Sequence, residues 1–273
     1  MRPKLSALPA PVLAGVVRAK TPGEARAEIK NCLYHGAGMI DLHLSCFEEK
    51  DEETFAAAMR SSALPILALH YDTTAEGKRL GTTEEERTEC LFRAVRAGAA
   101  GVDLQGYSFH QPSRTAFCGE DRYSFTKNAP KEVVTDPEII GRQTEFIERV
   151  HREGAEVLLS CHPGIYLDRD QVVELALFLE KRGPDLLKIV TVAENEDQLI
   201  ESFAAMLALK KEVRTPVTYH ASGKAGMLSR VINPVLGGHI AFCVDRFRAG
   251  STLEQLDLET AKRTVDALKR IKR

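Results

Sequence analysis

The chain alternates short apolar segments with longer amphipathic segments eight times. Short runs of apolar and β-branched residues are typical of buried strands, and amphipathic runs of ten or more residues are typical of helices. Strands are expected at residues 11–17, 39–46, 66–71, 101–106, 155–162, 186–193, 216–222 and 239–244. Helices are expected at residues 21–35, 52–62, 82–97, 136–152, 169–182, 196–211, 226–235 and 252–271. This alternation predicts a parallel sheet with helical crossovers.

Eight strand–helix pairs favour a closed (β/α)8 TIM barrel over an open doubly wound sheet, because the strands are too apolar for a one-sided sheet. No GxGxxG motif follows the first strand, which disfavours a dinucleotide-binding fold. The length of 273 residues suits a single barrel domain spanning residues 1–273. N-cap residues at Thr21, Thr82-Thr83 and Asp136, each followed by proline or acidic residues, support three of the helix starts.

The connection after the fourth strand, about residues 107–135, is unusually long. It follows a strand, so it is expected on the face of the barrel where active sites form. Its Arg114, Arg122, Tyr123 and Lys127 can meet substrate there. The alternative is a solvated excursion or a subunit contact.

Composition narrows the class of partner. The formal net charge is −2 and the isoelectric point is about 6.5, so no clustered positive charge indicates nucleic acid or an anionic membrane as partner. The six cysteines form no CxxC pair, which favours a reducing cytoplasm. No stretch approaches 18 consecutive apolar residues, and the first residues do not resemble an export signal. We therefore expect a cytoplasmic protein that binds a small molecule.

Lys188 lies inside the apolar segment Leu186-Leu187-Lys188-Ile189-Val190. An amine at such a position either reaches solvent or is buried, and burial favours its neutral form. A neutral amine attacks a ketone to form an imine, and the protonated imine withdraws electrons when an adjacent proton is removed. Lys188 is therefore the candidate Schiff-base residue.

His162 follows the apolar run of the fifth expected strand and precedes Pro163-Gly164. At the mouth of the barrel beside Lys188, its imidazole is suited to proton transfer at neutral pH. Ser160, two residues earlier, is expected on the same face and could orient it. The alternative is a structural histidine bonded to a loop carbonyl.

The segment from Gly223 to Arg230 follows the seventh strand and opens a helix. Glycines there allow backbone N–H groups to approach an anion, and Arg230 can bind a carboxylate through two hydrogen bonds. A plain capped turn with a surface arginine is the competing interpretation.

From Pro11 to about Glu259 the chain resembles the type I 3-dehydroquinate dehydratases of the shikimate pathway of aromatic amino acid biosynthesis. Ser160-Cys161-His162 is similar to the family's Ser-x-His, Asp185-Leu186-Leu187-Lys188-Ile189 to its Schiff-base strand, and Gly223-Lys224-x-Gly226-x-x-Ser229-Arg230 to its carboxylate-binding turn. The resemblance implies a hydro-lyase without cofactor or metal, in which Lys188 forms the imine and His162 is the general acid and base. It also implies that Arg230, Ser251 and Gln255 bind the substrate carboxylate. Barrels of this kind often pair, so a homodimer is expected.

Several strand ends depart from the family pattern, in which they carry Glu-x-Arg, arginine, Asp-x-Glu and methionine. The residues at these places are Asp41 and His43 on the second strand, His70 and Tyr71 on the third, Asp103 and Gln105 on the fourth, and His220 on the seventh. A pocket built on charged side chains selects its substrate strongly, so these exchanges predict altered specificity. We expect Asp41, His43, Tyr71 and His220 to line the pocket of a divergent member whose substrate is 3-dehydroquinate or a related carboxylated cyclic ketone.

Two other functions remain open at this stage. A metal-dependent barrel is the first, because histidine and aspartate ligands suit zinc or manganese. Its candidate ligands are His43, His70, His162, His220, Asp41 and Asp103. The second is a non-catalytic relative that binds a carboxylated metabolite.

Overall fold

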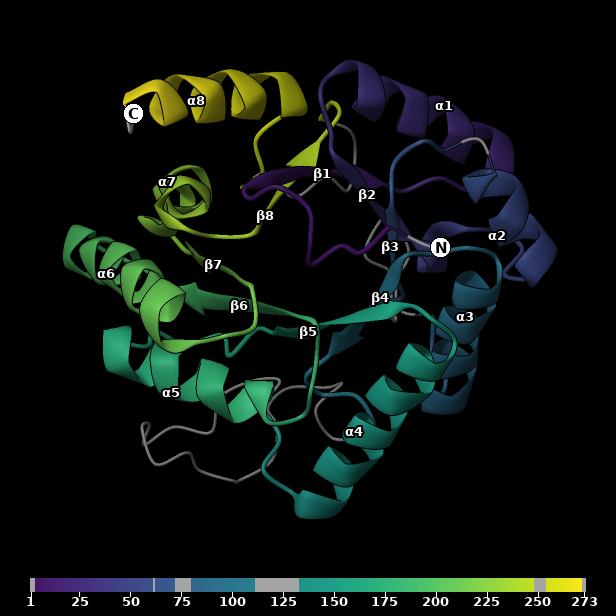
Figure 1. Cartoon of the computed structure of the whole chain (residues 1–273), viewed down its shortest axis with the longest axis horizontal. Helices are drawn as coiled ribbons and strands as arrows, with labels where there is room; N and C mark the ends of the chain where they lie inside the picture. Colours follow the sequence, from purple (N-terminus) through teal and green to yellow (C-terminus); the bar gives the residue numbers. More distant parts are fainter. Residues whose placement is uncertain (1–2, 61, 72–79, 111–132, 248–253, 272–273) are drawn as a thin grey trace. The chain divides into compact units, whose positions relative to one another are not determined.

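The structure, a computed structural model, describes residues 3–60, 62–71, 80–110, 133–247 and 254–271. In these ranges eight strands alternate with eight α-helices in the predicted order (Figure 1). The strands are β1 (Val12–Val17), β2 (Met39–His43), β3 (Ile66–Leu69), β4 (Gly101–Gln105), β5 (Glu156–Cys161), β6 (Leu186–Val192), β7 (Val217–Ser222) and β8 (Ile240–Val244). The helices are α1 (Pro22–Tyr34), α2 (Glu52–Met59), α3 (Glu84–Arg96), α4 (Pro137–Arg152), α5 (Arg169–Glu180), α6 (Glu196–Glu212), α7 (Ser229–Leu236) and α8 (Leu258–Ile271).

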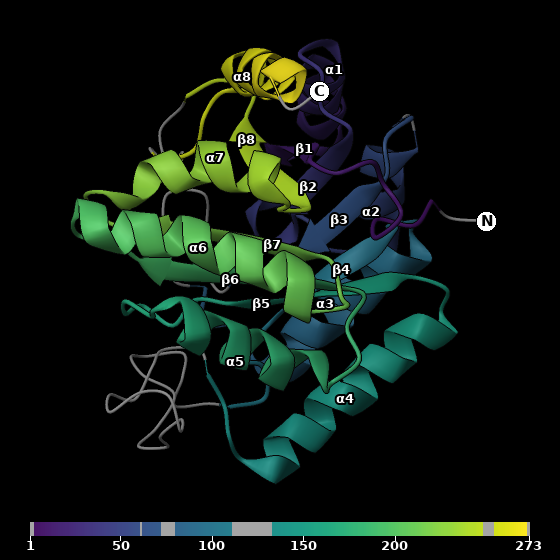
Figure 2. The ribbon, with the colours of Figure 1, turned by 60° about the vertical axis from the view of Figure 1, so that its left-hand side comes forward.

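The chain divides into two compact units. The first comprises residues 1–103, 150–156 and 241–273, and the second comprises residues 104–149 and 157–240. In the first unit the strands lie in the order β4-β3-β2-β1-β8, and the printed pairs β1–β2, β2–β3 and β3–β4 are parallel. In the second unit β5, β6 and β7 are parallel neighbours, and α6 and α7 both pack on β7 (Figure 2).

Both faces of the strands are buried, as expected for parallel strands covered by helices. All residues of β2, β4 and β5 are buried, including the polar side chains among them. The first unit also contains an N-terminal contact: Leu5 is fully buried, and Ser6 Oγ donates to Glu156 Oε1 at 2.6 Å.

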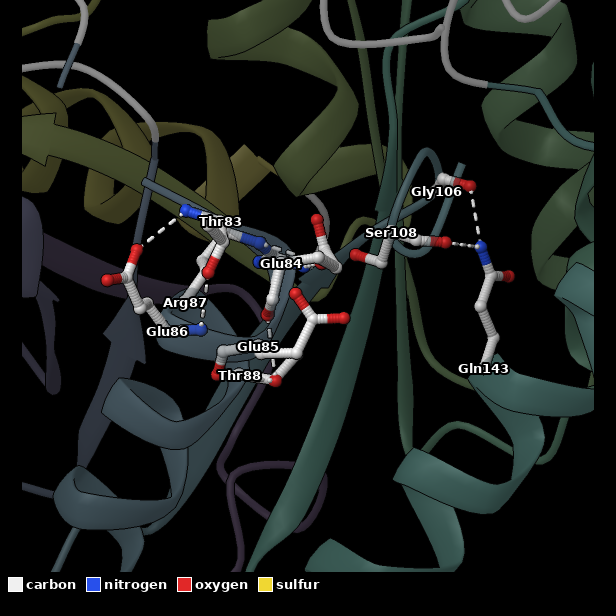
Figure 3. Close-up of polar contacts among 9 residues, drawn as sticks. All are labelled: Thr83, Glu84, Glu85, Glu86, Arg87, Thr88, Gly106, Ser108 and Gln143. Atoms are coloured by element: carbon white, nitrogen blue, oxygen red, sulfur yellow. Dashed lines mark hydrogen bonds and ion pairs between the residues drawn. The ribbon is translucent and has the colours of Figure 1, made fainter. Parts of the chain in front are cut away.

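The predicted helix starts are confirmed at Thr21, Thr83 and Asp136. Thr21 Oγ1 accepts from the Glu24 amide at 3.3 Å, and Asp136 Oδ1 accepts from the Glu138 amide at 2.8 Å. Thr83 and Glu86 form a reciprocal capping box, drawn in Figure 3. No helix in the described ranges is long and apolar enough to cross a membrane.

Local turns and caps explain where expected boundaries were wrong. The second strand ends at His43 rather than at residue 46, because residues 44–46 form a 3₁₀ turn closed by the Phe47 amide on the Leu44 carbonyl. The last helix begins at Leu258 rather than at residue 252. Asp257 Oδ1 accepts from the Thr260 amide at 2.9 Å, so Asp257 caps the helix at that point.

Candidate active site

Lys188 lies on the face of β6 opposite to the side chains that meet the helices. Thr191 and Tyr219 are buried on the helix-facing side, where Thr191 Oγ1 and Tyr219 Oη are 3.0 Å apart. Burial raises the pKa of the Tyr219 phenol, and Glu201 of α6 adds to this increase. Since successive side chains alternate between faces, Lys188 and His220 lie on the other side of the sheet. Lys188 is half-buried rather than enclosed.

His220 lies on this face, and neighbouring charges affect its pKa. Burial lowers its pKa well below the usual value, and Arg230, Lys188 and His162 lower it further. The side chain is only 5 % exposed, so a neutral imidazole is strongly favoured. Three cationic or potentially cationic side chains of the second unit are therefore close enough to His220 to affect its protonation. The structure brings together four of the residues singled out from the sequence.

Ser160 and His162 lie on the strand next to Lys188. Ser160 is the register partner of Lys188 in the parallel β5–β6 pair and is fully buried. His162 directly follows β5, one residue beyond the end of the strand, and is half-buried. Its position two residues after Ser160 directs it to the face that carries Lys188.

The turn between β7 and α7 requires two glycines. Gly223 has φ +88°, and a side chain there would come within 2.8 Å of the Ala193 carbonyl oxygen. A Cβ at Gly226 would lie 2.7 Å from the carbonyl carbon and oxygen of Ala221. The chain therefore returns closely along the end of β7 before the helix begins.

Ser229 stabilises this turn through two hydrogen bonds to the backbone. Its buried hydroxyl accepts from the Ala221 amide at 2.8 Å and donates to the Gly226 carbonyl at 2.6 Å. The next residue is Arg230, which is half-buried and close enough to His220 to lower its pKa. The turn thus fixes the backbone from which the Arg230 side chain extends.

In the first unit, the end of β2 carries a carboxylate–imidazole pair. Asp41 Oδ2 and His43 Nε2 are 3.3 Å apart, and both side chains are buried. The ring of Tyr71 meets the His43 ring at a centroid distance of 5.9 Å and an interplanar angle of 63°. Asp41 Oδ1 is buried without a hydrogen-bond partner among the described residues, which suits it to accept a hydrogen bond from a ligand hydroxyl. His70 and Asp103 of this unit are also buried, and so is Gln105 of the second unit, at the end of β4.

The remaining predicted residues divide into two groups. Gln255 lies in the turn before α8, and its buried Oε1 has no hydrogen-bond partner among the described residues. Ser251 lies outside the described residues, as do Arg114, Arg122, Tyr123 and Lys127. On the metal-dependent alternative, no three His, Cys, Asp or Glu side chains within the described ranges are grouped so that they could hold a metal ion.

Two buried polar pairs were not anticipated. Arg87 and Glu84 form an ion pair in the first turn of α3, and Arg182 donates to Gln143 between α5 and α4. Glu84 and Arg87 have an i, i+3 spacing that usually indicates an exposed pair. Arg182 follows a helix end, where a basic residue is ordinary. Neither pattern marks a buried group in a sequence.

Comparison with known proteins identifies the family. The model of the type I 3-dehydroquinase family matches residues 133–272, slightly more than half of the chain. A 3-dehydroquinate dehydratase of Desulfotalea psychrophila is 27% identical over 209 residues, covering 76% of this chain and 77% of the relative. A 3-dehydroquinate dehydratase of Aromatoleum aromaticum is 25% identical over 214 residues, covering 77% of this chain and 70% of the relative.

Solved structures agree on the fold. The 3-dehydroquinate dehydratase of Geobacillus kaustophilus has a TM-score of 0.76 at 14% identity, covering 100% of this chain and 98% of that one. The type I enzyme of Clostridium difficile, solved with covalently modified comenic acid, has a TM-score of 0.75 at 14% identity, covering 97% and 94%. With the eight alternating strand–helix pairs, these likenesses confirm the predicted (β/α)8 TIM barrel. The chain belongs to the type I 3-dehydroquinase family.

Proposed function

We propose that this protein is a Schiff-base hydro-lyase that removes water from 3-dehydroquinate or a closely related carboxylated cyclic ketone. The observation that supports the proposal is the strand register that sets Lys188 beside Ser160, two residues before His162, in a chain of this family. The charges of Arg230, Lys188 and His162 also lower the pKa of the buried His220. An amine, a proton-transfer group and a carboxylate-binding guanidinium are the three functions that such a dehydration needs. No cofactor or metal takes part in the proposed steps.

The reaction begins when the Lys188 amine attacks the ketone carbon and water leaves, giving a protonated imine. His162 then removes the proton from the adjacent carbon, and the electron pair of that C–H bond moves toward the imine nitrogen to form an enamine. The enamine expels the hydroxyl group on the next carbon, which leaves as water after receiving a proton from His162. A second water hydrolyses the conjugated imine, which frees the enone and restores the amine.

Arg230 binds the substrate carboxylate in this scheme, and the Gly223–Gly226 turn holds the arginine in place. The family resemblance assigns Gln255 and Ser251 to the same carboxylate. Ser160 keeps the backbone of His162 in register with Lys188. The neutral His220 donates or accepts one hydrogen bond without adding a further positive charge beside the amine.

Asp41, His43 and Tyr71 are proposed to select the ring substituents of the substrate. Asp41 Oδ1 is a buried acceptor with no partner in the described ranges, so a substrate hydroxyl gains a hydrogen bond there. The imidazole and phenol stand where the family has an arginine, which weakens recognition of a second anionic group. A substrate with one carboxylate and several hydroxyls fits this set.

The test is dehydration of 3-dehydroquinate, followed by the ultraviolet absorbance of the conjugated product. The Lys188→Met variant should lose at least about 1000-fold in kcat, because no other group supplies the covalent step. Lys211→Met is the matched control, since Lys211 is an exposed lysine of the same unit, on α6. Turnover that survives Lys188→Met would exclude this mechanism. Binding of substrate without turnover by the unaltered protein would instead favour a non-catalytic relative.

The remaining proposals concern the protein as a whole. A single domain spanning residues 1–273, a homodimer, a cytoplasmic location and a place in the shikimate pathway follow from the family resemblance and composition. Sedimentation of the purified protein checks the homodimer directly.

A further inference from the structure

Gln143 of α4 holds the turn that follows β4. The side chain is fully buried, and its Nε2 donates to the carbonyl oxygens of Gly106 and Ser108, both at 2.9 Å (Figure 3). Ser108 is itself fully buried, so its carbonyl gains this partner in place of water. One amide therefore satisfies two backbone groups of the same turn.

Arg182 fixes the orientation of that amide. Its Nη1 donates to Gln143 Oε1 at 2.6 Å, and its Nη2 donates to the Val134 carbonyl at 3.0 Å. A guanidinium only donates and a backbone carbonyl only accepts, so the flipped amide would place like groups against each other on both sides. Arg182 is 2 % exposed and lies 5.0 Å from the centre of the Phe178 ring.

The two ends of the long connection meet at this pair. Gly106 and Ser108 precede residues 111–132, and Val134 follows them. Between them Phe109 adopts φ 68°, a left-handed conformation that is costly for an aromatic residue. Its ring packs on Phe146 at 6.1 Å and beneath the Arg142 guanidinium at 4.8 Å. A strained residue persists where surrounding contacts hold it, which is the case here.

The same turn is bonded to the strand that leads to His162. The Gly106 amide donates to the Ser160 carbonyl at 2.6 Å. Ser160 is the register partner of Lys188 and lies two residues before His162. A shift of the Gly106–Ser108 turn is therefore transmitted to the backbone that carries the imidazole.

We propose that Gln143 and Arg182 are positioning residues that hold the Gly106–Ser108 turn and, through the Gly106–Ser160 hydrogen bond, set the place of His162 opposite Lys188. This inference rests on the proposed function, in which His162 transfers protons for an imine on Lys188. Neither residue touches the reacting atoms. A misplacement of about 1 Å in a proton-transfer group costs up to about 100-fold in rate, which sets the scale of the expected effect.

The test compares Gln143→Met with Glu145→Gln, a change at an exposed residue of the same helix. Gln143→Met keeps the side-chain length and removes every hydrogen bond of the amide. We expect roughly tenfold faster hydrogen exchange in residues 104–110 and also in residues 133–136, because both segments depend on one network. We also expect kcat to fall about 10- to 100-fold with KM within about twofold, and imine trapping at Lys188 to continue. Glu145→Gln should change none of these.

Arg182→Lys is the second variant, in case Gln143→Met does not fold. A lysine can reach one of the two acceptors but not both, so one segment should exchange faster while the other stays protected. The inference is overturned if Gln143→Met leaves kcat unchanged in an active protein, or if neither segment exchanges faster. If the wild-type protein neither traps an imine nor dehydrates any ketone, the proposed function is overturned instead. The two failures are distinguishable, because the first is seen in the variants and the second in the wild-type protein.

Discussion

Replacing His220 by methionine should remove a pH dependence of stability that the buried imidazole causes. Burial lowers the pKa of His220 in the folded protein, and Arg230, Lys188 and His162 lower it further. In the unfolded chain the ordinary value of about 6.5 applies. Below that pH the His220 imidazole binds a proton in the unfolded chain but stays neutral in the folded protein. The free energy of unfolding therefore decreases as the pH falls.

The magnitude follows from linkage. At pH 5.5, one unit below the unfolded value, the loss is about 1.4 kcal/mol relative to pH 8, provided that the folded imidazole stays neutral. Urea unfolding gives the change in the free energy of unfolding between pH 8 and pH 5.5 for each protein. The difference between wild type and His220→Met in that change is the contribution of His220. Other groups titrate equally in the two proteins and cancel. His151→Met, at an exposed histidine, controls for the loss of an imidazole. Equal pH dependence in wild type and His220→Met would refute the argument.

Three further measurements test the packing within the two units. Ser229→Ala leaves the buried Ala221 amide without its acceptor and should lower the free energy of unfolding by about 1–3 kcal/mol, while KM rises as Arg230 loosens; urea unfolding and kinetics check this. Gly226→Ala should destabilise by about 1–3 kcal/mol because its Cβ meets the Ala221 backbone at 2.7 Å; a thermal melt that matches wild type would contradict the predicted clash. Burial raises the pKa of the Cys90 thiol to about 12, so iodoacetamide at pH 8 should label Cys90 only in unfolded protein, as peptide mass spectrometry can show.

The fold could be predicted because its signal repeats. Each strand is a short apolar run and each helix an amphipathic one, so eight independent segments indicated the same parallel architecture. Boundaries were less certain where a cap decides them. Asp257 caps α8, yet an aspartate between Leu256 and Leu258 cannot be recognised as an N-cap until the fold places it.

The candidate site was predictable where a polar side chain interrupts or follows an apolar strand. Lys188 and His162 interrupt or follow apolar runs, and strand alternation is enough to place them on one face. Gln143 and Arg182 were not predictable, because their contact joins helices α4 and the end of α5 through tertiary packing alone. The importance of such residues comes from burial, which composition and periodicity do not report.

Covalent capture of substrate tests the central claim most directly. The protein is incubated with 3-dehydroquinate and borohydride and then digested, and the peptide masses are measured by mass spectrometry. The account predicts that the mass of the reduced substrate adduct appears on the peptide carrying Lys188. It also predicts that Arg230→Met reduces the yield while Lys211→Met does not. Catalytic turnover without any adduct, or an adduct on a different lysine, would contradict it.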